Sequence, residues 1–316
     1  MNVLVRVPKF TSPFWTAKGE PRASVTLRAL ETLWFNTGTL CNITCANCYI
    51  QSSPRNDRLV YLSLADVETY LDEIRRDGHP TRLIGFTGGE PFMNPTFPAI
   101  LEKTLSRGFE TLTLTNAMRP MMRHKGVIAQ LVATYGPSMR MRVSLDDYRA
   151  EVHDRERGRG SFAKAMEGLR SLASLGVTVE VAGRFLSGDT EDQLRAGFAR
   201  TLRRAGITID CLDPRQLVLF REMREDADPP EITPACWGIL NVSPDGVMCS
   251  SARMVVRRGG SERPVVVACT LLAYDQRFEL GATLADANKP VYLAHPHCAT
   301  FCVLGGAACG AARKDH

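Results

Sequence analysis

The feature that most constrains the fold is an alternation, between residues 30 and about 220, of short β-rich runs with amphipathic helical stretches. Ser63 with Asp66 and Thr190 with Gln193 mark two helix starts, because their spacing allows a capping box. Six β–α units in succession predict parallel strands joined by right-handed crossovers. The runs expected to form the strands are residues 32–35, 82–87, 110–115, 139–145, 177–182 and 207–219.

The periodicity alone leaves two arrangements open, an open doubly wound sheet and a partial barrel. In both, ligand-binding residues belong at the carboxyl ends of the strands. After residue 226 the sequence becomes loop-rich, with two short strands expected at 239–242 and 247–249 around a turn. We expect a small module held together by metal there. The predicted units are an N-terminal arm (1–29), the main domain (30–227) and the C-terminal extension (228–316).

Cysteine usage indicates metal binding. The 316-residue chain has ten cysteines, three at 41–48 and six between 236 and 309. No segment resembles a signal peptide or a run of about 20 apolar residues, so a cytoplasmic location is expected, where disulfides rarely persist. Clustered thiols in that compartment are typical metal ligands. The net charge of +5 comes without a dense basic run, so neither nucleic acid nor a membrane is expected as a partner.

The first cluster, Cys41, Cys45 and Cys48, directly follows the first expected strand. Thiolates at C-x3-C-x2-C spacing can bind three irons of a 4Fe–4S cluster and leave the fourth iron open for a ligand. The alternative is a structural zinc site, which needs a fourth ligand nearby. Neither Cys nor His occurs between Tyr49 and Arg76.

Further motifs follow the later strands: Gly88-Gly89-Glu90-Pro91, then Thr115-Asn116-Ala117, then Ser144-Leu145-Asp146 with an R-G-x-G-S-F run from residue 157. In this order, after the cysteine loop, they resemble the radical S-adenosylmethionine (SAM) superfamily over residues 30 to about 215. The resemblance implies a partial (β/α)6 TIM-type barrel with a small loop-rich C-terminal iron–sulfur extension. It also implies a cluster whose open iron binds SAM and cleaves it to a 5′-deoxyadenosyl radical.

The resemblance assigns roles to residues in these motifs. Gly88 and Gly89 would let the backbone approach SAM closely, and Glu90 would accept a hydrogen bond from the methionine ammonium. Ser144 would hydrogen-bond the methionine carboxylate or the ribose, and Asp146 would orient the ribose.

Four other residues of the barrel have less specific expectations. Asn116 matches a position near SAM in the family. Arg184 would pair with the SAM carboxylate or be a surface arginine. Tyr49 would pack against the adenine or be a core aromatic residue, and His153 is expected to be structural.

The C-terminal cysteines resemble those of the auxiliary-cluster domains called twitch and SPASM. The pattern departs from the family, because only two residues separate Gly246 from Cys249. We expect one auxiliary 4Fe–4S cluster and treat Cys269 as a buried thiol; Cys211 is left unassigned. The expected ligands are Cys236, Cys249 and two of Cys298, Cys302 and Cys309.

The implied reaction is hydrogen-atom abstraction from a substrate at the barrel mouth, and the resemblance favours maturase-like modification of a peptide or protein. A cyclase or oxidoreductase acting on a small molecule is the alternative. A non-catalytic iron–sulfur electron carrier is a rival of another class, and it has no use for the SAM motifs. Expected partners are the substrate, a flavodoxin- or ferredoxin-type electron donor and, because only 29 residues precede the first strand, a separate peptide-recognition protein.

Overall fold

The computed structural model describes residues 8–221 and 228–305. Six parallel strands follow one another across its sheet in chain order, which confirms the alternation seen in the sequence. They form a partial (β/α)6 barrel of the TIM type. The strands are β2 (Thr32–Asn36), β3 (Leu83–Thr87), β4 (Glu110–Thr115), β5 (Met139–Ser144), β6 (Thr178–Arg184) and β7 (Leu217–Phe220).

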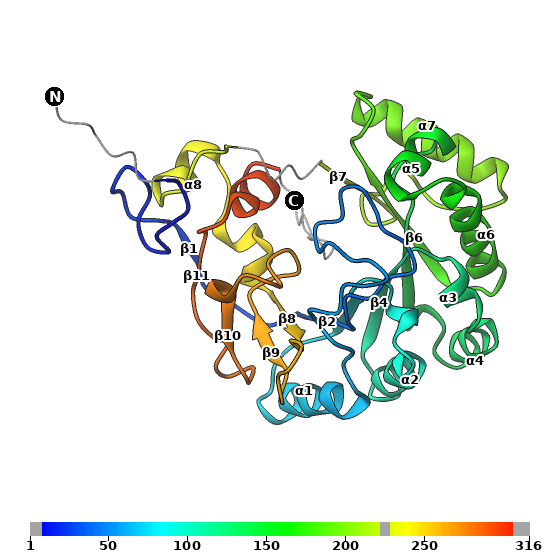
Figure 1. The fold of residues 1–316 in the computed structure, drawn as a ribbon, viewed down its shortest axis with the longest axis horizontal. Helices are drawn as coiled ribbons and strands as arrows, with labels where there is room; N and C mark the ends of the chain where they lie inside the picture. Colours follow the sequence, from blue (N-terminus) through cyan, green and yellow to red (C-terminus); the bar gives the residue numbers. More distant parts are fainter. Residues whose placement is uncertain (1–7, 222–227, 306–316) are drawn as a thin grey trace.

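The helices lie along the outer side of the curved sheet, whereas the loop between β2 and α1 crosses its inner side (Figure 1). Both capping boxes are present, at the starts of α1 and α7. The helices are α1 (Leu64–Arg76), α2 (Phe97–Ser106), α3 (Arg119–Met122), α4 (Lys125–Tyr135), α5 (Ala150–Arg157), α6 (Ser161–Ser174) and α7 (Glu191–Arg204).

Close packing fixes the register of the first two barrel strands. Trp34 pairs with Gly85 and is fully buried. A Cβ atom on Gly85 would collide with the indole ring, so glycine is required there. The sixth strand is shorter than expected: it occupies only Leu217–Phe220. The preceding turn around Asp213 and Pro214 accounts for the difference, because proline has no N–H for a ladder and the Asp213 carboxylate accepts a hydrogen bond from the Arg215 N–H.

The C-terminal extension continues the same sheet. Strand β8 (Ala252–Val256) pairs in parallel with β2, and β9 (Val265–Val267) and β10 (Glu279–Gly281) then add antiparallel strands. The full order is β10-β9-β8-β2-β3-β4-β5-β6-β7. The strands of the extension therefore belong to the same sheet as the barrel strands, and the rest of the extension is loop-rich.

The prediction of strands at 239–242 and 247–249 is wrong. Helix α8 (Ala235–Leu240) ends at Asn241, which adopts the left-handed conformation that closes a helix. Two 3-10 turns, η3 (Pro244–Gly246) and η4 (Met248–Ser250), follow. Local apolar runs cannot separate a short helix from a short strand, and here the strand begins at Ala252.

The described part of the N-terminal arm lies against the extension. Strand β1 (Ser24–Val25) pairs with β11 (Val291–Tyr292). Arg22 forms a buried ion pair of 2.5 Å with Glu231. The domain boundaries expected from the sequence stay predictions. Within residues 8–221 and 228–305, no helix has the length and apolar character needed to cross a membrane.

Candidate functional site

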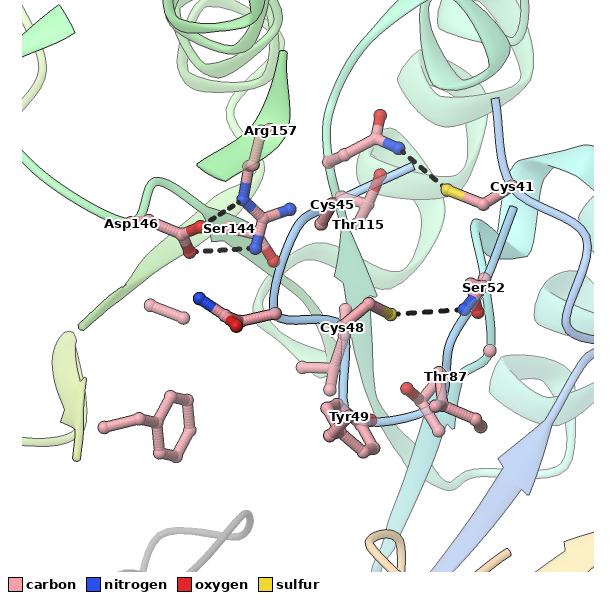
Figure 2. Close-up of a pocket in the computed structure, with 18 of the residues that line it drawn as sticks. Cys41, Cys45, Cys48, Tyr49, Ser52, Thr87, Thr115, Ser144, Asp146 and Arg157 are labelled. Atoms are coloured by element: carbon pink, nitrogen blue, oxygen red, sulfur yellow. Dashed lines mark hydrogen bonds and ion pairs between the residues drawn. The ribbon is translucent and has the colours of Figure 1, made fainter. Parts of the chain in front are cut away.

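A cavity lies at the carboxyl ends of the parallel strands, where the sequence motifs were expected (Figure 2). The loop after β2 contributes three thiols to its wall, and the ends of β3 to β7 contribute the rest of the barrel side. Leu271 and Phe301 add an apolar wall from the C-terminal extension. The expected site residues that line the cavity are Cys41, Cys45, Cys48, Tyr49, Gly88, Gly89, Asn116, Ser144, Asp146 and Arg184.

The two glycines hold the cysteine loop against the turn after β3. A Cβ atom on Gly88 would collide with the Gly38 carbonyl, and one on Gly89 would collide with the Leu40 carbonyl. The Gly89 N–H donates to Gly38 O at 2.8 Å, and the Glu90 N–H donates to Leu40 O at 3.1 Å. Leu40 precedes Cys41, the first of the three loop cysteines, so the absence of side chains at 88 and 89 positions the loop as well as opening the cavity.

The three thiols sit in different surroundings. Burial raises the pKa of Cys41 to about 12 and also raises that of Cys45. The Asn116 side-chain amide donates to Cys41 Sγ at 3.8 Å, and the Ser52 N–H donates to Cys48 Sγ at 3.3 Å. Iron binding must therefore displace the protons of the buried thiols, and amide donors are in place for sulfurs that carry negative charge.

Glu90 lies beneath the cavity wall and is 1% exposed. Its carboxylate accepts hydrogen bonds from Thr115 Oγ1 at 2.8 Å, the Asn116 N–H at 2.8 Å and the Phe92 N–H at 3.3 Å. Burial raises its pKa to about 7, although these hydrogen bonds oppose the rise. The carboxyl group thus ties the turn after β3 to the end of β4. Its contact with a SAM ammonium stays a prediction.

Asp146 and Arg184 belong to a charged network on the other side of the cavity. Arg157 Nε and Nη2 donate to the two Asp146 oxygens at 2.8 and 2.9 Å. Arg184 Nη1 lies 3.9 Å from Asp146 and 3.4 Å from Glu156, whereas its buried Nη2 has no hydrogen-bond partner within residues 8–221 and 228–305. Since a buried donor without a partner is costly, Arg184 Nη2 is suited to a ligand oxygen.

The sequence-based prediction missed several lining residues. Arg157 occurs in the quoted R-G-x-G-S-F run, but nothing local showed that its side chain reaches Asp146 (Figure 2). Arg142 lines the cavity from β5 and pairs with Glu180 at 2.7 Å. His153 has the expected structural role, since it is fully buried and its Nδ1 accepts from the Asp146 N–H at 3.1 Å.

The C-terminal cysteines are distributed unevenly. Cys249 and Cys298 are buried beside the core, and Cys302 is one turn beyond Cys298 in the π-helix η6 (Cys298–Val303). Cys236 lies in α8, where its sulfur contacts Thr233 N at 3.4 Å. Cys309 lies outside the described residues. In the described part, no three Cys, His, Asp or Glu side chains converge as they would around a single metal ion. A cubane has a wider spread, because each thiolate binds a different iron.

The comparison with known families decides the classification. Residues 35–217 match the family described as the radical SAM superfamily. The chain belongs to this family. Members of the radical SAM superfamily use a 4Fe–4S cluster and SAM.

Two sequence relatives of this radical SAM chain share part of its length. AlbA, an antilisterial bacteriocin subtilosin biosynthesis protein of Bacillus subtilis, is 35% identical over 143 residues, which cover 45% of this chain and 30% of AlbA. The mycofactocin maturase MftC of Mycolicibacterium smegmatis is 29% identical over 169 residues, 54% of this chain and 41% of MftC. The match thus spans less than half of either relative.

Streptococcus suis SuiB has a similar fold. The SAM-bound structure has a TM-score of 0.59 at 11% identity and covers 80% of this chain and 63% of SuiB. The structure bound to its precursor peptide SuiA has a TM-score of 0.50 at 14% identity, with coverage of 63% and 40%. At these identities the likeness shows the fold alone.

The residues of the cavity fit both groups that the family uses. Three thiols line it, and within the described residues no further cysteine and no histidine does, which leaves one iron of a cubane open. In the part of the chain that the structure describes, the Arg184 Nη2 donor has no partner, and a guanidinium donor suits a carboxylate. A structural zinc site built of Cys and His would lack its fourth ligand among the described residues that line this cavity.

Proposed function

We propose that this chain cleaves SAM reductively at the Cys41–Cys45–Cys48 loop and abstracts a hydrogen atom from a peptide held at the barrel mouth. The observation that carries the proposal is that one cavity is lined both by three thiols and by Arg184, whose buried Nη2 has no hydrogen-bond partner among the described residues. When bound and reduced, the cluster supplies the electron that breaks the sulfonium bond of SAM. The electron-carrier alternative gives no reason for an open cavity with a carboxylate-binding guanidinium beside the cluster loop.

The chain's own residues position SAM. Ser144 and Arg184, at the ends of β5 and β6, would bind the methionine carboxylate, and Glu90 would receive the ammonium. Arg157 holds both oxygens of Asp146 on one side, so the remaining lone pairs of Asp146 are fixed in direction for the ribose hydroxyls. The Asn116 side-chain amide donates to Cys41 Sγ at 3.8 Å. Tyr49, the residue after Cys48, would pack against the adenine of SAM.

A peptide is the proposed substrate because AlbA and MftC are named for bacteriocin biosynthesis and mycofactocin maturation, and SuiB is solved with a precursor peptide. The lining of the cavity is suited to an apolar side chain of the substrate. Phe220 and Phe301 stack with ring centroids 5.7 Å apart, and Leu271 lies on the same wall. The proposal also includes two partner proteins, a flavodoxin- or ferredoxin-type electron donor and a separate protein that recognises the peptide. It places the chain in the reducing cytoplasm.

An auxiliary 4Fe–4S cluster in the C-terminal extension also belongs to the proposal. Its support is the group of cysteines there, of which Cys249 and Cys298 are buried in the same hydrophobic core cluster. The ligands expected from the sequence are Cys236, Cys249 and two of Cys298, Cys302 and Cys309. Leu271 and Phe301, which line the cavity, lie within a few residues of cysteines of the extension.

The substrate proposal can be tested with the anaerobically reconstituted chain, dithionite, SAM and short peptides encoded beside its gene. We expect a SAM-dependent change in the mass of one peptide, together with more 5′-deoxyadenosine than in its absence. Cys48→Ala should remove both, and Cys211→Ala, a change at a buried cysteine outside the cavity, should preserve both. If SAM is cleaved but only a small molecule is modified, the peptide proposal is wrong and the cyclase or oxidoreductase alternative replaces it.

A further inference from the structure

The cysteine loop comes to the surface of the molecule beside the barrel cavity. Thr44 and Ala46, which flank Cys45, are exposed, and neither is among the residues that line the cavity. The Ala46 N–H donates to Glu156 O at 2.8 Å, and the Asn47 side-chain amide donates to Glu156 Oε2 at 2.9 Å. The loop is therefore held against the last turn of α5, and a protein that contacts Thr44 or Ala46 comes within one residue of Cys45.

Exposed cations lie on the α5 side of this loop. Arg155 is next to Glu156 in α5, and Arg159 follows in the turn to α6. The Asp154 carboxylate accepts hydrogen bonds from the N–H groups of residues 160 and 162, at 2.6 and 2.8 Å, and these bonds fix the turn. Lys164 is exposed in the first turn of α6. Three cations therefore lie around the point where α5 holds the loop.

Two more cations lie on the α3 side of the loop. The Asn42 side-chain amide donates to Met118 Sδ at 4.0 Å, so the start of the loop contacts the residue before α3. Arg119 is the first residue of α3, and the Arg123 N–H donates to Arg119 O at 3.2 Å, one turn further. Both arginines are exposed. Helix α3 packs against α6, as α5 does, and Figure 1 shows the three helices on one side of the barrel, away from the C-terminal extension.

The exposed charges around the loop are almost all positive. We call this surface the loop rim; it consists of Thr44, Ala46, Arg119, Arg123, Arg155, Arg159 and Lys164. Within residues 117–125 and 155–167, the exposed charged side chains are the five rim cations, Lys125 and a single carboxylate, Glu167. None of the five rim cations forms an ion pair with a residue in the described ranges 8–221 and 228–305. The loop rim therefore presents a net positive charge to an approaching partner.

The position of this charge favours one kind of partner. None of the five rim cations lines the cavity, so their charge is not directed at SAM or at the reacting residue of the substrate. The cluster must receive an electron from outside the chain, and the rate of electron transfer falls steeply with distance. Complexes of electron-transfer proteins are small and weak, and opposite charge on the two surfaces speeds and orients their encounter. A positive surface one residue from Cys45 meets both requirements, whereas a nucleic acid or an acidic peptide has no need of the cysteine loop.

We propose that the loop rim is the docking surface for an acidic electron carrier of the flavodoxin or ferredoxin type. The inference rests on the proposed function and adds to it the place where the electron enters. One electron leaves the reduced carrier, which is oxidised, and enters the 4Fe–4S cluster, which is reduced; no bond in either protein forms or breaks. The rim cations steer and orient the carrier, whereas the apolar wall of Leu271 and Phe301 belongs to a different part of the chain.

Electron transfer from a carrier protein tests this surface. The reconstituted full chain with SAM is mixed without oxygen with a reduced flavodoxin of net negative charge, and stopped-flow absorbance measures the second-order rate constant of flavin oxidation. In the rim variant, which combines Arg119→Gln, Arg155→Gln and Arg159→Gln, this rate constant should fall by about tenfold at an ionic strength of about 0.01 M. Calorimetry should show weaker binding of the oxidised flavodoxin to the same variant.

The control variant removes the same charge at another place. It combines Arg200→Gln, Arg203→Gln and Arg204→Gln, which change three exposed cations of α7, and it should keep the rate constant and the affinity of the unaltered chain. At an ionic strength of about 0.5 M the unaltered chain should slow towards the rim variant, because salt screens surface charge.

A small reductant checks that the rim variant is folded. Photoreduced 5-deazariboflavin is neutral and needs no docking surface, so it should support equal formation of 5′-deoxyadenosine in the unaltered chain, the rim variant and the α7 control. If the rim variant does not fold, Arg159→Gln alone replaces it, with Arg200→Gln as its control.

The outcomes separate the inference from the proposed function. Equal rate constants in the unaltered chain and the rim variant overturn the inference, and so does an equal loss in the α7 control. Normal electron transfer with lost peptide modification in the rim variant would assign the surface to the peptide, which also overturns it. If deazariboflavin supports SAM cleavage but neither the flavodoxin nor an acidic ferredoxin reduces the unaltered chain, the inference fails while the proposed function stands. If no reductant supports SAM cleavage by the fully loaded, unaltered chain, the proposed function fails instead.

Discussion

Arg157 donates one hydrogen bond to each carboxylate oxygen of Asp146, at 2.8 and 2.9 Å, and this pair forms the charged side of the cavity. Asp146 lies two residues after β5, and Arg157 is the last residue of α5. Burial opposes ionisation of Asp146, but Arg157 more than compensates and the pKa of the carboxyl is lowered. The pair therefore stays ionised next to the cluster loop.

Removing Arg157 should lower the free energy of unfolding, because the buried Asp146 carboxylate then lacks its main ion-pair partner. Arg157→Met leaves the Asp146 carboxylate with only the more distant Arg184, so we expect the free energy of unfolding to fall by about 3–5 kcal/mol. Arg157→Lys keeps the charge but loses the two-point contact, and its loss should be smaller. Chemical denaturation of the three proteins under identical anaerobic conditions measures the difference. Equal stability of the methionine and lysine variants would contradict a role for the charge.

Arg184 should determine much of the affinity for SAM. In Arg184→Gln the carboxylate loses a charged donor, so the dissociation constant should rise by roughly tenfold or more, given about 1.5–3 kcal/mol for hydrogen bonds to charged groups. Calorimetry on the reconstituted protein measures this, with an unchanged cluster spectrum as the check of folding. Arg200→Gln, at an exposed position on α7, is the matched control. Unaltered affinity in Arg184→Gln would show that its guanidinium serves only Glu156 and Asp146.

Glu90 should make SAM binding dependent on pH. Its pKa is raised by burial to about 7, and only the ionised carboxylate attracts the methionine ammonium. Affinity should therefore increase as the pH rises from about 6 to about 8, because the protonated fraction falls through this range. In Glu90→Gln the affinity should be lower and this increase should be absent. The same pH profile in both proteins would mean that Glu90 only joins the turn after β3 to β4.

His153 should contribute to loss of stability in acid. Burial lowers its pKa from 6.5 to about 4, so its contribution is fully present above pH 6.5 and is lost as the pH falls through 4. At about 1.4 kcal/mol per pH unit, the loss approaches about 3 kcal/mol. His153→Asn keeps an acceptor near the Asp146 N–H and should reduce the loss between pH 6.5 and 4. Denaturation of the iron-free chain across this range measures it; identical pH profiles would contradict the assignment.

The barrel could be predicted from the sequence because each of its strand–helix units is encoded by a short, continuous stretch of residues. The strand–helix units carry their own apolar periods, α1 and α7 begin with capping boxes, and parallel order then brings the ends of the strands to one edge. Cys41, Gly88, Asn116 and Ser144 thus meet in one cavity although about 100 residues separate the first from the last. Residue type and order alone predicted that they belong to one site, and their individual roles toward SAM stay predictions.

The remaining features depend on contacts that no local pattern encodes. Strand β8 pairs with β2, which lies about 220 residues earlier in the chain. The partnership of Arg157 with Asp146 needs the turn of α5.

The most direct test of the account is the amount of 5′-deoxyadenosine formed from SAM by the anaerobically purified, dithionite-reduced chain. We predict several equivalents of product in the unaltered protein and in Cys211→Ala, and none in Cys45→Ala, which lacks one ligand of the barrel cluster. Undiminished product in Cys45→Ala, or no product from an unaltered chain with its cluster fully loaded, would contradict the assignment of this cavity.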